Sequence, residues 1–73
     1  MDEEPKYHVI YDEGRSEDFL TVDEAVRQAS LDDRCGRIPI SIACVERGSG
    51  RIVYTGRMLQ KAIAKWRDAH PGD

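Results

Sequence analysis

Cysteine, long apolar runs and a basic leader are scarce or missing in this sequence, and each shortage argues against a class of protein. Two cysteines in 73 residues, Cys35 and Cys44, are too few for a disulfide framework and lack the Cys-x-x-Cys spacing of zinc modules. No apolar run approaches the roughly 18 residues of a membrane span, and the first residues are acidic where a secretory signal is basic. We therefore expect a cytoplasmic protein with free thiols and with Cys44 in its core.

The chain is also short, and 73 residues provide one domain with a single modest core. We expect that domain to span 1–73, with 1–5 and 71–73 frayed. The net charge of −3 conceals an uneven distribution. Eleven acids and three bases give 1–33 a balance of −8, whereas eight bases and three acids give 34–73 a balance of +5. Either the two halves attract each other within the fold, or one face is free to meet an anionic partner.

Apolar residues alternate in KYHVIY, at positions 6–11, which predicts a strand. Its core face would carry Tyr7, Val9 and Tyr11, and His8 would face water. DEGR then turns the chain, and SEDFL, at 16–20, is a candidate short second strand anchored by Phe19.

The next segment, TVDE, has the form of a capping box, in which Thr21 accepts from the backbone of Glu24. A helix is predicted from position 22, loosening after Ser30 and ending by Gly36. The later LQKAIAKW segment repeats apolar residues at helical spacing, and Pro71 ends that second helix. Its apolar stripe contains Leu59, Ala62, Ile63 and Trp66.

Two strands, RIPISIACVE and RIVYT, flank the sequence GSG and predict a hairpin. A loop of odd length would gather the apolar residues of both strands on one face, so GSG is interpreted as a three-residue loop in which Gly50 has positive φ. The core face would then carry Ile40, Ile42, Cys44, Ile52 and Tyr54. The predicted fold is α+β, with a small antiparallel or mixed sheet of three to four strands, two helices on one face, and the order β-(β)-α-β-β-α.

Sequence signals for catalysis are weak. The glycines of RGSGR join two strands rather than a strand and a helix, unlike a phosphate-binding loop. The possible metal ligands His8, Cys35, Cys44 and His70 lack a short spacing, and no carboxylate pair stands out as acid and base. We therefore expect no enzyme, no cofactor and no metal.

Two surfaces are candidates for binding. If both helices cover one face of the sheet, the other face exposes apolar residues for an unidentified protein or a second copy of the chain, at Ile10, Ala43, Val45 and Val53. A sheet edge could serve the same purpose. The alternative is a nucleic-acid-binding module in which basic residues of the hairpin tip and final helix contact phosphates, at Arg47, Arg51, Arg57, Lys61 and Lys65.

Overall fold

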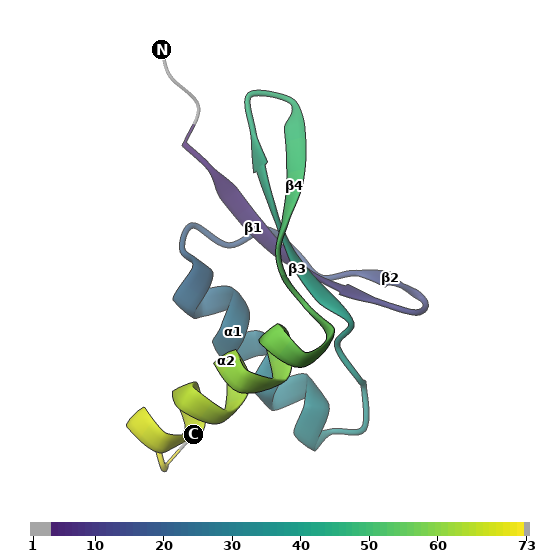
Figure 1. The fold of residues 1–73 in the computed structure, drawn as a ribbon. Helices are drawn as coiled ribbons and strands as arrows, with labels where there is room; N and C mark the ends of the chain where they lie inside the picture. The colour runs from purple at the N-terminus through teal and green to yellow at the C-terminus, as the bar shows by residue number, and fades with distance from the viewer. Residues whose placement is uncertain (1–3, 73) are drawn as a thin grey trace.

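A four-stranded antiparallel sheet and two helices make up the fold (Figure 1), and the computed structural model describes residues 4–72. The elements are β1 (Lys6–Tyr11), β2 (Gly14–Arg15), α1 (Val22–Arg34), β3 (Ser41–Glu46), β4 (Ser49–Thr55) and α2 (Gly56–Ala69). The strands lie in the order β2-β1-β3-β4, and every neighbouring pair is antiparallel. The predicted α+β class and element order are confirmed. Of the expected frayed ends, 1–3 and 73 lie outside the described residues.

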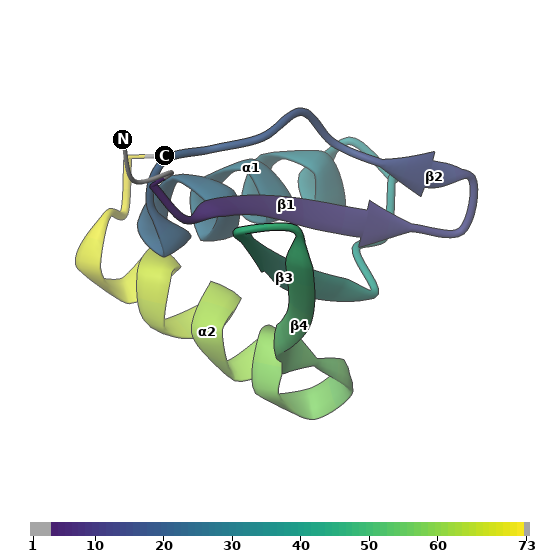
Figure 2. The same cartoon turned by 90° about the horizontal axis from the view of Figure 1, so that it is seen from above.

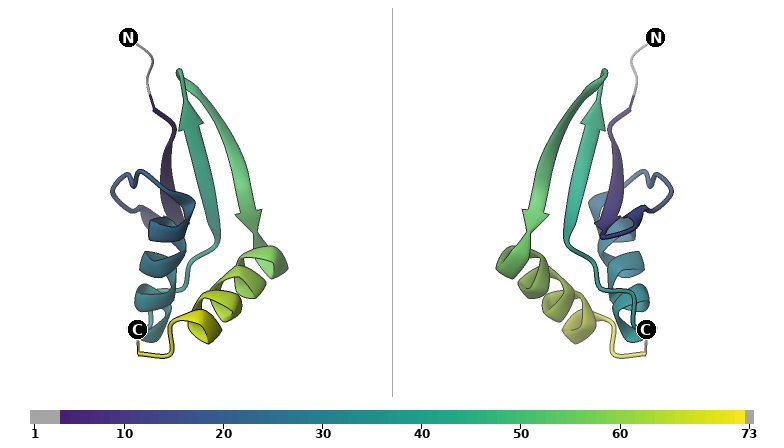
Figure 3. Two further views of the ribbon diagram at one scale, coloured as in Figure 1. Left: turned by 90° about the vertical axis from the view of Figure 1, so that its left-hand side faces the viewer. Right: turned by 90° about the vertical axis from the view of Figure 1, so that its right-hand side faces the viewer.

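Both helices pack on one face of the sheet, as predicted. The core joins residues of β1 and β3 to the apolar stripes of α1 and α2, and its buried members are Val9, Tyr11, Ala25, Val26, Ala29, Ile42, Leu59 and Ile63. Viewed from above, α1 lies along β1, and α2 leads away from the end of β4 (Figure 2). The hairpin of β3 and β4 extends past the helices, so its turn lies at the opposite end of the molecule from α2 (Figure 3).

The first helix begins where the capping sequence predicts. Thr21 is extended, and its Oγ1 accepts a hydrogen bond from the backbone N–H of Glu24 at 3.2 Å. The helix remains regular to Arg34, so the expected loosening after Ser30 is wrong. Arg67 of α2 donates to the side chain and the carbonyl of Ser30, at 2.9 and 3.1 Å, which is a tertiary contact that local periodicity does not reveal.

The hairpin turn differs from the prediction. It has two residues, Arg47 and Gly48, with φ of 52° and 80° between the paired residues Glu46 and Ser49. Two consecutive positive φ values are typical of the type I′ turns that favour two-residue hairpins. The three-residue loop is therefore wrong, and Gly50 lies within β4 without positive φ.

A β-bulge in β4 accounts for that error. Ile42 pairs with Tyr54, but Ala43 pairs with Ile52, so Val53 is an extra residue between the two pairs. One inserted residue reverses the alternation of a strand as effectively as an odd loop does. Tyr54 therefore packs against the core, whereas Ile52 is 53% exposed, contrary to its predicted burial.

The other apolar residues predicted for the core are partly buried as expected and partly exposed. Cys44 is buried as expected, but Ile40 precedes β3 and is 41% exposed. The irregular segment before β3 breaks the alternation on which the prediction for Ile40 depended. In α2, Leu59 and Ile63 are buried, and Trp66 is half-buried against the core cluster.

Ion pairs join the acidic and basic halves of the chain. Arg37 contacts Glu13 at 2.8 Å, and Arg67 contacts Asp33 at 3.2 Å. Both pairs are at least one-third exposed at one partner, so each contributes little to stability alone. Some of the bases in 34–73 are therefore paired with acids of 1–33 within the fold.

Candidate interaction edge of the sheet

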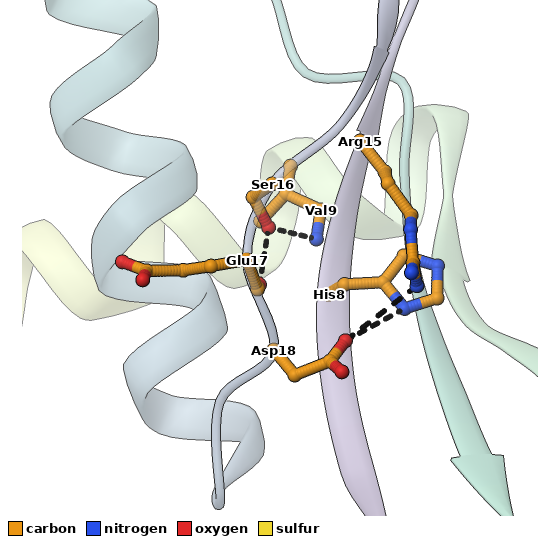
Figure 4. Close-up of polar contacts among 6 residues, drawn as sticks. All are labelled: His8, Val9, Arg15, Ser16, Glu17 and Asp18. Atoms are coloured by element: carbon orange, nitrogen blue, oxygen red, sulfur yellow. Dashed lines mark hydrogen bonds and ion pairs between the residues drawn. The ribbon is translucent and has the colours of Figure 1, made fainter.

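The outer edge of β1 is closed by the chain that follows it. β2 pairs with the end of β1, and the next residues continue along the same edge (Figure 4). Ser16 donates its backbone N–H to the Val9 carbonyl at 2.8 Å, and its Oγ accepts from the Val9 N–H at 2.8 Å. Tyr7 and Phe19 exchange two backbone hydrogen bonds, at 2.7 and 2.8 Å. The backbone groups along this edge are therefore satisfied.

This closure partly corrects the predicted second strand. Regular pairing occurs at Gly14–Arg15, inside the predicted turn, and Phe19 forms only an isolated bridge with Tyr7. The side chain of Ser16 replaces one backbone partner, so the segment closes the edge without being a continuous strand. Alternating hydrophobicity does not detect such a segment, because its role depends on backbone and hydroxyl hydrogen bonds.

His8 of β1 is buried, contrary to the prediction that it faces water. It is only 7% exposed, and Asp18 and Arg15 lie beside it (Figure 4). Its Nδ1 lies 3.7 Å from an Asp18 carboxylate oxygen, beyond hydrogen-bond distance, and that atom has no hydrogen-bond partner. Burial lowers the pKa of His8 from its usual 6.5, and the positive charge of Arg15 adds to this effect, while Asp18 opposes it. His8 is therefore neutral at pH 7.

The outer edge of β4 is open. Within residues 4–72, no strand or loop pairs with that edge, and Figure 3 shows it at the margin of the sheet. Backbone groups alternate in direction along an antiparallel strand. Because Ser49 closes the two-residue hairpin turn, Gly50 and Ile52 direct their N–H and C=O groups outward. The regular part of the open edge runs from Ser49 to the bulge at Val53.

The face opposite the helices provides less exposed apolar surface than the sequence predicts. Ala43 is only 6% exposed, because its small side chain lies between His8 and Ile52 on the neighbouring strands. Its expected exposure is therefore wrong. Ile10 and Val45 share that face and are half-buried. Ile52, which was predicted for the core, has the most exposed side chain among these apolar residues.

The five basic candidates do not gather at one place. Arg47 and Arg51 belong to the hairpin end, whereas Lys61 and Lys65 belong to the body of α2 at the other end (Figures 1 and 3). Arg57 follows β4 directly, in the first turn of α2. All five side chains are exposed. The structure thus separates the candidate basic residues of the hairpin from those in the body of α2, and it leaves three arginines along and around β4.

Other polar groups stabilise the fold rather than form an obvious reaction site. Tyr11 donates to Asp32, and burial with this hydrogen bond raises the tyrosine pKa. The Arg37 guanidinium lies 3.8 Å from the Tyr11 ring centre. A hollow of about 290 Å³ is lined by residues of both helices and by Tyr54. Its lining includes Trp66, whose indole stacks on His70 at 3.7 Å between ring centres.

The described part of the chain lacks a metal-binding cluster and a membrane-spanning helix. Residues 4–72 contain no group of three or more histidine, cysteine or acidic side chains placed to hold a metal ion. The same residues contain no helix with the length and apolar character needed to cross a membrane. Comparisons with protein-family models, curated proteins and solved structures found no match to this chain.

Proposed function

We propose that this domain is a non-catalytic protein-interaction module that binds its partner by adding an extended segment of that partner to the open edge of β4. The supporting observation is the contrast between the two sheet edges. The β1 edge has its backbone groups satisfied by the segment from Gly14 to Phe19, whereas β4 presents outward N–H and C=O groups at Gly50 and Ile52. Unpaired edge groups of this kind are templates for strand addition.

Surroundings of the open edge also support this function. The hairpin extends beyond the helices, so a partner strand reaches β4 without displacing the core (Figure 1). Ile52 adds a half-exposed apolar side chain at the same edge. Main-chain hydrogen bonds would supply affinity, and side chains on alternate positions would supply specificity.

Peptide selection tests this function. A displayed library of random peptides long enough to form a strand is selected against the wild-type domain, and the selected peptides are measured against two variants. Ile52→Pro removes an outward N–H at an edge position where proline is tolerated, whereas Ile52→Thr keeps that N–H and a β-branched side chain. We expect Ile52→Pro to abolish binding and Ile52→Thr to retain it, with circular dichroism confirming that both variants fold.

Amide hydrogen exchange on the wild-type domain provides the same test without substitution. A selected peptide should slow exchange at Gly50 and Ile52, because their N–H groups would become paired. Peptides that bind Ile52→Pro as tightly as wild type, or that leave both amides unprotected, would exclude strand addition.

A further inference from the structure

The two side chains at the centre of the open edge differ in chemistry and point to opposite faces. Arg51 pairs with Cys44, whose side chain belongs to the helix-covered face, and Ile52 pairs with Ala43 on the uncovered face. A strand added beside β4 would place its own successive side chains on these same two faces. Cross-strand neighbours on one face interact directly, so the partner meets a cation on one face and an aliphatic group on the other.

Charge around the open edge is predominantly positive. Positions 46–57 contain three arginines and one acid, Glu46, whereas positions 12–18 at the closed edge contain four acids and one arginine. A second copy of β4 would bring the same arginines to the same edge, and like charges across paired strands are unfavourable. This charge distribution disfavours pairing between copies and favours a negatively charged partner.

The start of α2 adds to the positive character at the end of β4. The Thr55 hydroxyl accepts a hydrogen bond from Ser41 at 3.0 Å and makes no cap contact with the helix. The first turn of α2 contains no acidic residue, and Arg57 lies within it. The positive end of this 14-residue helix is therefore not neutralised by its own sequence.

We infer that the segment accepted by β4 is an acidic extended peptide, with carboxylates on the face that carries Arg51 and apolar side chains on the face that carries Ile52. This inference rests on the proposed strand addition and specifies the chemistry of the partner. Carboxylates beside Arg51 form charge-assisted hydrogen bonds, while aliphatic groups beside Ile52 remove apolar surface from water.

Fluorescence anisotropy with two labelled peptides tests the inference on the full chain. One peptide alternates valine with glutamate, and the other alternates valine with lysine at the same length. We expect the valine-glutamate peptide to bind at least about 10-fold more tightly at physiological ionic strength. Arg51→Glu should reverse or abolish that preference, whereas the control Lys61→Glu makes the same charge change on the body of α2 and should preserve it.

Other outcomes separate the two proposals. Equal binding of both peptides, lost in Ile52→Pro, would overturn the acidic preference and leave strand addition supported. The same conclusion follows if neither of these two peptides binds while the library-selected peptides bind the wild-type domain and lose binding in Ile52→Pro. Equal weakening by Arg51→Glu and Lys61→Glu would overturn recognition at Arg51 and indicate attraction by overall charge.

Preferred binding of duplex DNA, falling steeply with salt and unchanged in Ile52→Pro, would overturn both proposals in favour of nucleic-acid binding. Concentration-dependent dimerisation lost in Ile52→Pro would overturn the acidic partner in favour of a second copy.

Discussion

The two edges of this sheet have the same backbone donors and acceptors, but in the described part of the chain the β1 edge is hydrogen-bonded to another segment and the β4 edge is not. Beyond β1, the chain turns back and satisfies the outward groups with backbone and serine hydrogen bonds, ending at the Tyr7–Phe19 bridge. Beyond β4, the chain leaves directly into α2, and no strand or loop within residues 4–72 pairs with the outer edge of β4. Edge protection is therefore selective in this fold, and the exposed edge is the one surrounded by arginines. Three predictions test this contrast.

The largest expected effect distinguishes the two isoleucines of the hairpin. Ile42 is fully buried, so Ile42→Ala should lower the free energy of unfolding by about 2–5 kcal/mol. Ile52 is 53% exposed on the open side, so Ile52→Ala should cost about 1 kcal/mol or less. Urea denaturation measures both values. Equal losses would show that the bulge does not separate the two side chains.

The second prediction makes the same substitution, serine to alanine, at the two edges, and its expected effect on stability is smaller. Ser16→Ala removes the acceptor of the buried Val9 N–H and should destabilise the fold by about 1–3 kcal/mol. Ser49→Ala changes an exposed residue of β4 and should alter stability by about 0.5 kcal/mol at most. Chemical denaturation of both variants measures this difference, and comparable stabilities would mean that the closed β1 edge does not depend on the Ser16 hydroxyl.

The smallest expected effect is a pH dependence at the closed edge. Burial and Arg15 lower the pKa of His8 in the folded state, so the unfolded chain binds a proton at higher pH than the folded chain does. The contribution of His8 is complete above its usual pKa of about 6.5 and is lost as pH falls from there toward the lower folded pKa.

Thermal unfolding between pH 8 and pH 5 measures this loss. His8→Gln should reduce the acid-induced fall in melting temperature, because the variant lacks the buried imidazole that takes up a proton more readily in the unfolded chain. A wild-type slope unchanged by His8→Gln would assign the pH dependence to other groups.

Much of the fold follows from local sequence patterns, whereas the candidate site depends on details that those patterns do not encode. Alternation in β1, the Thr21 cap and the stripe at Leu59 and Ile63 all predict their elements correctly. The same reasoning misplaces Ile52, because an extra residue in the turn and an extra residue in the strand have the same effect on alternation. The choice between them depends on backbone dihedral angles at Arg47 and Gly48, which hydrophobicity does not report.

The candidate site was only partly accessible from the sequence. The basic residues near the hairpin are evident from charge alone, but their position beside an unpaired edge depends on strand order. That order places β1 between β2 and β3 and leaves β4 outermost. The burial of His8 was missed because it depends on neighbouring side chains such as Arg15 and Asp18, in an acid-rich segment whose contacts the alternation of hydrophobicity does not report.

The bulge at Val53 separates β4 into two regions with different packing constraints. Below it, Tyr54 contributes to the core, and its side chain is constrained by the helices. Above it, the segment from Ser49 to Ile52 carries no residue of the core cluster. Substitutions in that short segment can therefore alter the proposed edge contacts without repacking the interior, which makes the hairpin tip suitable for transplanting peptide sequences onto this scaffold.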